Sequence, residues 1–505
     1  MIFAQAFKRA KNLTVYYILF FGKIKPFFED VDKFNSLIKI IGGMLMKFLE
    51  FCNTYVLGVS VPLVLMAAGI FFIVRLRAFP FLHPLRVIKT VLTRERCDGI
   101  SPWRALSMAL AGVLGVGNLV GVAAALSAGG AGAIFWMWVS ATLAMLLKYA
   151  ETMLALRHRR RGRDGWRGGA MYYIEAAFGG RLERVGRGMA FAFAFLCLAD
   201  AFSMGCVVQG NAVASALQGR WEIPTLAVGG TVALVVFLVG LGGAKSVSGT
   251  TERLIPLLTV GFVVVSLAAI LSRAEQIPGL LRQICASAFV GQTAGKSIAG
   301  GVGGFLLSRA LRFGTMRGLL SNEAGCGTSP MAHATSSGED AAKQGCMGIV
   351  EVFVDTHLLC TMTAFVLLLA WDRVSSLGDN PMLMTIQAYE VLLGPWAGAF
   401  LCVAVLCFGM ATLFCWSHYA GEACVYLVGE RGRYTTLWRR LCLFVYCLFC
   451  VVGAAVAPES IWTVADFSIG LMTLLNIFVL CRMHREIERV SGALMGRGGG
   501  EKTKQ

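Results

Sequence analysis

The chain has 505 residues, of which 57% are hydrophobic and only 15% are charged, and its mean hydropathy is +0.69. A soluble protein of this length needs far more polar surface, so the composition argues against a soluble fold and predicts a polytopic membrane protein in a lipid bilayer. The formal net charge of +17 does not indicate nucleic-acid binding, because the positive residues cluster in short loops between apolar windows.

Eleven apolar windows are long enough to cross a membrane, which takes about 20 residues. In chain order they are 54–74, 104–127, 131–156, 188–216, 223–243, 253–272, 300–335 (interrupted), 346–371, 396–428, 436–456 and 459–481. The expected fold is therefore all-α, with about 11 transmembrane helices. The first apolar run, 13–21, leads into Lys23 and Lys25 without a small-residue cleavage site, so we expect no cleavable signal peptide.

Arginine and lysine are concentrated in alternate loops. Loops 75–102, 157–187 and 429–440 and the tail after Cys481 are basic, whereas the loops between them hold few positive residues. Basic loops stay in the cytoplasm. We therefore expect a multi-pass protein of the plasma (inner) membrane whose C-terminus is cytoplasmic and whose residue 53 is outside.

The N-terminal end conflicts with that orientation. Residues 1–43 should be outside, yet they hold seven positive residues, Lys8, Arg9, Lys11, Lys23, Lys25, Lys33 and Lys39. Translation from Met44 or Met46 removes the conflict, and the alternative is a tolerated extension. We expect three regions: an extension (1–43), one transmembrane domain (44–482) and a basic tail (483–505). N-terminal sequencing that recovers residues 1–43 would argue against the later start.

Two of the windows are interrupted in the same way. The second contains AGVLGVGNLVG (111–121) and the seventh contains SNEAGCGTSP (321–330), so both combine glycines with an asparagine. They are the first and sixth windows of a ten-helix core, and such a pair predicts an inverted-repeat transporter. Backbone groups freed by the breaks must line a cavity, because they cannot stay unpaired in lipid.

Longer blocks resemble the alanine-or-glycine:cation symporter family. They are GVGNLVGVAAALSAGGAGAIFWMWVSATLAMLLKYAE (115–151), GGAMYYIE (168–175), RGLLSNEAGCGTSPMAHA (317–334) and VFVDTHLLCTMTA (352–364), with weaker matches near Trp416 and Asp466. The resemblance covers about residues 50–480. It implies a LeuT-like fold of the amino acid–polyamine–cation superfamily, a 5+5 inverted repeat with one extra N-terminal helix (54–74) before core helices within 104–481.

The same resemblance implies a function. A member of this family is a secondary active transporter, not an enzyme, and imports a small neutral amino acid, such as alanine or glycine, by symport with a cation such as sodium. We expect no other cofactor and a monomer. An intramembrane enzyme built on Glu323 and His333 is disfavoured, because the chain has no HExxH or GxSxG motif, and we expect His333 to be a solvated helix end.

The breaks suggest where a substrate binds. Amides near Gly115, Val116 and Gly117 suit a carboxylate, because the N-terminal ends of half-helices attract anions. Glu323 is expected to face a polar cavity, since a membrane-embedded carboxylate needs a partner; an ion pair with Arg312 or Arg317 is the alternative. The family resemblance adds further substrate residues, Gln209, Leu320, Asn322, Gly325 and Trp416.

Oxygen atoms around the first break suit a cation. We assign the cation, expected to be sodium, to Asn118 and to the backbone of Ala111, Val113 and Leu114. The resemblance adds Thr412, in the position of a second cation site. Val113, Val116 and Ala411 stand where the family usually carries hydroxyls, and lost oxygens weaken a sodium site. A proton-coupled or uncoupled transporter and a non-transporting amino-acid sensor therefore remain open.

Three other features carry expectations. Lys148 and Glu151 are three residues apart and should pair on one helix face. Asp200 lies nine residues before Gln209 and is either a helix-packing acid or a proton site. Asp355 matches the family but is also explained by a structural role. The sequence leaves open the exact substrate, the stoichiometry, the oligomeric state and the roles of Arg309, Arg312 and Arg317.

Overall fold

The computed structural model describes residues 43–93, 97–162, 165–289, 308–378, 380–429, 434–455, 459–492 and 494–495. The chain divides into two units, residues 1–52 and 53–505. Of the first unit, residues 43–52 are described, and they are helical. The predicted extension of residues 1–43 lies outside the described residues except for Gly43.

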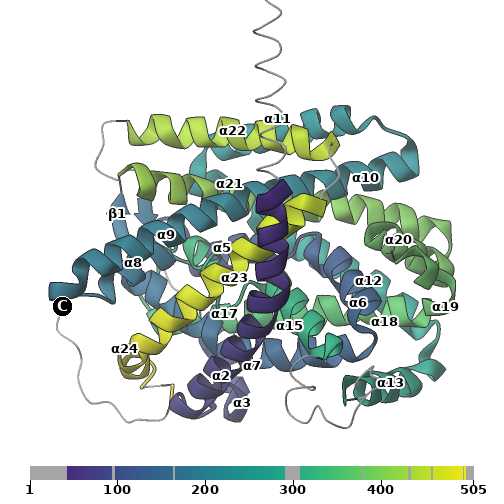
Figure 1. The fold of residues 1–505 in the computed structure, drawn as a ribbon, viewed down its shortest axis with the longest axis horizontal. Helices are drawn as coiled ribbons and strands as arrows, with labels where there is room; N and C mark the ends of the chain where they lie inside the picture. The colour runs from purple at the N-terminus through teal and green to yellow at the C-terminus, as the bar shows by residue number, and fades with distance from the viewer. Residues whose placement is uncertain are drawn as a thin grey trace, which may run out of the picture. The chain divides into compact units, whose positions relative to one another are not determined.

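The described chain is almost entirely helical, as the composition predicts (Figure 1). The strands that it contains form one short antiparallel hairpin, β1 (Arg160–Gly162) and β2 (Gly165–Arg167). This hairpin lies in the basic loop 157–187, where charge and glycine prevent a membrane-spanning helix.

Eight described helices are long and apolar enough to cross a membrane, and a bent pair makes a ninth. The eight are Gly43–Arg75, Gly132–Arg157, Gly180–Trp221, Gly243–Leu271, Ala341–Leu369, Pro395–Val428, Thr435–Ala455 and Ile461–Arg482. The bent pair is Pro102–Val113 with Gly117–Gly129. The chain is therefore an all-α polytopic membrane protein, but eleven helices of spanning length are not recovered.

The two remaining predicted spans fall short for identifiable reasons. Helix α11 (Thr225–Leu241) is apolar but has only 17 residues. The seventh window begins in residues outside the described part of the chain, and its described part is divided. There, α15 (Arg309–Asn322) and α16 (Pro330–His333) are separated by a non-helical loop, so neither half is long enough to span the bilayer alone.

Helix α7 is the centre of one group of packed helices, which we call the α7 group. It packs against α15 and α17, and α15 also packs against α6. The bounds are α6 (Val122–Gly129), α7 (Gly132–Arg157), α15 (Arg309–Asn322) and α17 (Ala341–Val352). Both interrupted spans contribute to this group.

A second set of helices, the α21 group, packs together through α9, α10, α11, α21 and α22. Figure 1 shows α22, α11, α21 and α10 running side by side. The bounds are α9 (Glu183–Phe202), α10 (Gln209–Trp221), α11 (Thr225–Leu241), α21 (Pro395–Val428) and α22 (Thr435–Ala455). Helix α5 (Pro102–Val113) contacts α21 of this group and α17 of the α7 group, so it lies between the two groups.

The remaining helices surround these groups. They are α2 (Gly58–Arg75), α3 (Phe79–Leu82), α4 (Pro84–Leu92), α8 (Ala170–Ala176), α12 (Gly243–Leu271), α13 (Ile277–Phe289), α18 (Thr361–Leu369), α19 (Trp371–Val374), α20 (Pro381–Leu393), α23 (Glu459–Arg482) and α24 (His484–Val490). Short 3₁₀ turns are η3 (Gly180–Leu182), η5 (Ala274–Gln276) and η8 (Ser375–Leu377).

Four segments of the described chain are π-helical, η1 (Cys52–Leu57), η2 (Gly117–Gly121), η4 (Ser203–Val208) and η7 (Phe353–Cys360). Such bulges are rare and are frequent at functional sites. Two of them lie at predicted site residues, since η2 contains Gly117 and Asn118 and η4 directly precedes Gln209.

Candidate functional site

The first predicted break is present between α5 and η2. Helix α5 ends at Val113, η2 begins at Gly117, and the two halves of the span are bent by 50°. Within the break, the Gly115 amide donates to the Val113 carbonyl at 2.8 Å. These residues are only two apart in sequence, which is closer than the hydrogen bonds of any helix join. The break therefore frees backbone groups inside the protein, where side chains or a ligand must satisfy them.

A side chain satisfies one of these groups. The Val116 amide donates to Gln209 Oε1 at 3.1 Å. Gln209 is buried at the start of α10, directly after η4. Both residues are predicted substrate contacts, and the structure brings them together as partners of each other. A substrate carboxylate that takes the Val116 amide must displace the Gln209 side chain.

Helix α21 covers the end of α5. Thr412 Oγ1 donates to the Ala111 carbonyl at 2.9 Å, and Trp416 Nε1 donates to the Gly112 carbonyl at 3.3 Å. A Cβ at Gly115 would lie only 2.6 Å from Thr412 Oγ1. Thr412 and Trp416 therefore lie at the first break, as the family resemblance implies.

The two breaks face each other. A Cβ at Gly117 would lie 3.7 Å from the Ser321 Cα atom and 3.8 Å from the Leu320 carbonyl oxygen. Leu320 is buried near the end of α15. Two segments about 200 residues apart in sequence thus meet at their interruptions, which is the arrangement that the paired glycine pattern predicts.

Asn118 extends from η2 toward η7. Its Nδ2 donates to Asp355 Oδ1 at 2.6 Å and to the Asp355 carbonyl at 3.2 Å. Its Oδ1 is buried and has no hydrogen-bond partner among the described residues. The predicted cation residues therefore divide: Asn118 lies with Asp355, whereas Ala111 lies with Thr412, and the Val113 carbonyl accepts from Gly115.

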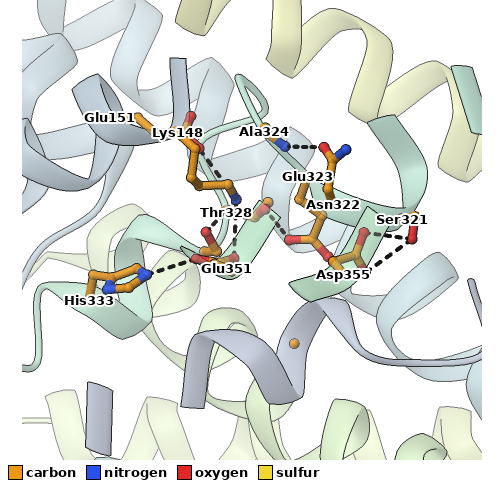
Figure 2. Close-up of polar contacts among 12 residues, drawn as sticks. Lys148, Glu151, Ser321, Asn322, Glu323, Ala324, Thr328, His333, Glu351 and Asp355 are labelled. Carbon is orange, nitrogen blue, oxygen red and sulfur yellow. Dashed lines mark hydrogen bonds and ion pairs between the residues drawn. The ribbon is translucent and has the colours of Figure 1, made fainter. Parts of the chain in front are cut away.

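Hydroxyl groups complete the surroundings of Asp355, a fully buried carboxylate. Ser321 Oγ donates to its two oxygens at 3.1 and 2.9 Å, as Figure 2 shows, and Thr356 Oγ1 donates to Oδ2 at 2.7 Å. Asn322 Nδ2 in turn donates to Thr356 Oγ1 at 3.0 Å. Carboxylate and hydroxyl oxygens from α15 and η7 converge here beside the Asn118 side chain of η2, and such oxygens are ligands that hard cations prefer.

The second break begins at Glu323, directly after α15. Glu323 has a φ of +51°, and Gly325 and Gly327 have φ values of +86° and +88°. A positive φ is uncommon for a residue with a side chain, so local contacts must hold Glu323 in place. Asn322 Oδ1 accepts from the Ala324 amide at 2.9 Å, and Glu323 Oε2 accepts a hydrogen bond from Thr328 Oγ1.

Glu323 does not form the alternative ion pair. Arg312 Nη2 donates to the Thr54 carbonyl at 2.8 Å, and Arg317 Nη1 lies 3.6 Å from Asp466 Oδ1. Glu323 is only 3% exposed and bonds to Thr328 in its own loop. Its carboxylate thus faces the interior of the broken segment.

A buried ion-pair network lies beside the second break. Lys148 Nζ is 3.2 Å from Glu351 Oε1, 3.5 Å from Glu151 Oε1 and 2.7 Å from Ser329 Oγ. Figure 2 shows Lys148 and His333 both pointing toward Glu351. The predicted Lys148–Glu151 pair is confirmed, and Glu351 is a third member that the local spacing does not reveal.

His333 differs from its prediction. It is fully buried rather than solvated, and its Nε2 lies 2.8 Å from Glu351 Oε2. The Gln344 side chain bonds its other ring nitrogen at 2.7 Å. The expectation was wrong because α16 and the following α17 both pack against α7, and α17 brings Glu351 and Gln344 to the two ring nitrogens.

Asn476 connects the same region to α23. Its Nδ2 donates to Glu151 Oε2 and to the Gly325 carbonyl, both at 2.9 Å. Its Oδ1 accepts from the Tyr173 hydroxyl at 2.6 Å. The Gly325 carbonyl freed by the second break is therefore satisfied by a side chain.

A small cavity remains at the first break. It has a volume of about 10 Å³ and is lined by Leu114, Gly115, Asn118, Leu119, Phe262, Leu359 and Phe408. About 10–15 Å³ of such space holds a single water molecule. An amino acid is larger, so the site is closed in this structure and the surrounding side chains must move for a substrate to enter.

Several of these residues are not predicted as site residues. Ser321 and Thr356 are hydroxyl residues beside Asn322 and Asp355, so their polarity inside apolar windows is a signal that the sequence does contain. Phe262 and Phe408 give no such signal, because aromatic residues are ordinary in a membrane span.

The chain matches a family model described as the sodium:alanine symporter family over residues 43–493. An uncharacterized transporter of Haemophilus influenzae is 34% identical over 448 residues, which cover 87% of this chain and 94% of that protein. The sodium/alanine symporter AgcS of Methanococcus maripaludis is 32% identical over 446 residues, which cover 86% of this chain and 94% of that protein.

Among solved structures, a manganese transporter of Eremococcus coleocola aligns with 81% of this chain and 84% of its own chain. The sequence identity is 16% and the TM-score is 0.47.

Proposed function

Because the chain belongs to the sodium:alanine symporter family, we propose that it imports a small neutral amino acid, with alanine or glycine as the expected substrate, by symport with sodium across the plasma (inner) membrane. The observation that carries the proposal is the meeting of the two interrupted spans, where η2 packs against α15 and Gly117 lies beside Leu320 and Ser321. At each break a buried polar side chain binds a freed backbone group: Gln209 accepts from the Val116 amide, and Asn476 donates to the Gly325 carbonyl.

The substrate carboxylate is proposed to bind the amides of Val116 and Gly117. Gln209 Oε1 holds the Val116 amide in the closed structure and acts as a placeholder for the carboxylate. Phe262, Phe408 and Leu359 form the apolar side of the small cavity. They favour a short uncharged side chain, since no described residue there is available to pair a charge.

The cation is proposed to bind at Asn118. Its Oδ1 is a buried acceptor to which no described residue donates, and Asp355, Ser321 and Thr356 supply further oxygens nearby. The Thr412 hydroxyl is engaged with the Ala111 carbonyl. Thr412 therefore remains the proposed second cation position, now together with the Ala111 carbonyl, and the backbone of Val113 and Leu114 stays a proposed cation ligand.

Uptake into proteoliposomes tests the function. The purified full-length protein is reconstituted, and labelled alanine or glycine is offered with an inward sodium gradient or with choline in its place. Sodium should drive accumulation above the equilibrium level. Failure to take up any small neutral amino acid under either condition would defeat the proposal.

Asp355→Asn tests the cation site. It removes the charge while keeping an oxygen, so the sodium concentration for half-maximal uptake should rise by about tenfold, equivalent to ~1.4 kcal/mol of binding free energy. The matched control is Asp372→Asn, because Asp372 is exposed on α19. An unchanged sodium dependence in Asp355→Asn would remove Asp355 from the site.

One observation favours two other candidates. One is a transporter that does not use sodium, and the other is a sensor that binds the amino acid but does not transport it. Val113 and Val116 line the first break where hydroxyls are expected, so the break offers few side-chain oxygens. Val116→Thr distinguishes the candidates. A stronger sodium dependence of uptake in this variant indicates a sodium site that the missing hydroxyl weakens. Tight alanine binding without flux in both the wild type and Val116→Thr indicates a sensor.

A further inference from the structure

Asp200 is a buried acid that the proposed function does not use. It lies on α9 at 0% exposure, three residues before η4, the π-helical segment that leads to Gln209. Neither of its carboxylate oxygens has a hydrogen-bond partner among the described residues. Its backbone carbonyl accepts from Ser203 Oγ at 3.3 Å, so the main chain is satisfied and the side chain is not.

The loop of the second break covers this part of α9. A Cβ at Gly327 would lie 3.0 Å from the Phe193 ring on the same helix. Cys326 and Glu323, both in that loop, are within electrostatic range of Asp200. Phe193 and Asp200 are seven residues apart, which puts them on the same face of α9, so the loop lies near the face that carries Asp200.

The other ionisable groups around Asp200 do not neutralise it. They are Cys197 on its own helix and Asp466 on α23. Asp466 is itself paired with Arg317 at 3.6 Å. From α8 and α21, which also pack against α9, no charged side chain of the described residues acts on Asp200. Its charged neighbours are acids, and it has no counter-ion in the described chain.

An ionised carboxylate in such a place is very unfavourable, because burial removes its hydration and nothing replaces it. A sodium ion would not stabilise the ionised carboxylate, because sodium needs several oxygen ligands. No described residue lies within hydrogen-bonding distance of the Asp200 carboxylate oxygens. A proton needs only one oxygen. It forms one O–H bond and leaves a neutral side chain.

We propose that Asp200 is a proton-binding site, loaded in this closed conformation, and that it releases its proton to water when the loop 323–329 moves away from α9. The proton is taken from water on one side of the membrane and returned to water on the other. The transport role rests on the proposed function, whereas the protonation state of Asp200 does not.

Infrared difference spectroscopy tests the protonation state without any transport. Spectra of the full-length protein in liposomes at neutral pH are compared with those of Asp200→Asn and of the control Asp372→Asn. The carbonyl band of a protonated carboxyl group should be lost in Asp200→Asn and kept in the control. Identical carboxyl bands in the wild type and Asp200→Asn would show that Asp200 is ionised and overturn the proposal.

Proton movement tests the transport role. Alanine is added with sodium to proteoliposomes while a pH-sensitive dye follows the medium. Asp200→Asn should retain sodium-driven uptake but lose the alanine-dependent pH change and flatten the pH profile of uptake. The proposal fails if Asp200→Asn keeps the same pH profile and the same pH change as the wild type.

Asp200→Glu provides a second variant if Asp200→Asn does not fold. It keeps an ionisable group, so a shifted carboxyl band and a retained pH change are expected. A carboxyl band that neither disappears nor shifts in Asp200→Glu would contradict the assignment. A wild-type protein that takes up no amino acid defeats the proposed function but leaves the infrared result to decide on Asp200.

Discussion

Gly115 shows how little space the first break has. A Cβ there would lie 2.6 Å from Thr412 Oγ1 and 3.0 Å from Gln209 Oε1. Both of those atoms belong to helices of the α21 group, so a side chain at Gly115 would push the break away from its neighbours. Overpacking of this kind typically costs about 1–3 kcal/mol.

Gly115→Ala should therefore lower the initial rate of alanine uptake by about tenfold or more, as a perturbation of ~1.4 kcal/mol would. The matched control is Gly121→Ala, since a Cβ at Gly121 has no heavy atom within 4 Å. Uptake by Gly121→Ala should stay close to the wild type. Equal uptake by both variants would show that close packing at Gly115 is not needed.

At the residue scale, the sequence identifies polar residues but not their partners. Asn118, Gln209 and Glu323 are conspicuous in apolar windows, and the structure buries all of them. Their partners, Asp355, Val116 and Thr328, lie 237, 93 and 5 residues away. Only the partner of Glu323 is local, and a short loop with positive φ values was needed to bring it close.

At the scale of elements, the buried Lys148 network joins three segments. Lys148 on α7 contacts Glu351 on α17 and Ser329 in the second break, and its side chain is fully buried. A buried ion pair contributes little net stability, but removing one partner strands the other charge and costs about 3–5 kcal/mol. The network therefore fixes the break against the α7 group.

Lys148→Met should strongly lower the melting temperature of the detergent-solubilised protein, because Glu351 and Glu151 would be left without their cation. Glu351→Gln alone should also lower the melting temperature of the protein. The double variant Lys148→Met/Glu351→Gln should lose less than the sum of the two single variants, since the stranded charges are removed together. Strictly additive losses would mean that the pair is not coupled.

At the scale of the whole molecule, the orientation predicted from basic loops has a direct chemical test. Cys285 lies on α13 and is exposed. Under the predicted orientation, α13 belongs to an outer loop. A membrane-impermeant maleimide should therefore label Cys285 in intact cells, and Cys285→Ser should lose this label.

Cys97 provides the internal control for that experiment. It is partly exposed in the loop 75–102, which the prediction places in the cytoplasm. It should be labelled only after the membrane is opened. Labelling of Cys97 but not Cys285 in intact cells would show the opposite orientation.

The sequence by itself determined the class of fold, the positions of most helices and the two breaks, because these follow from hydropathy and from glycine, both of which act locally along the chain. Tertiary structure alone decided that Gly117 lies beside Ser321, that Asn118 bonds to Asp355 rather than joining Thr412, and that His333 is buried against Glu351. These contacts join helices distant in sequence. Their geometry depends on how the helices pack, and local patterns carry no information about that packing.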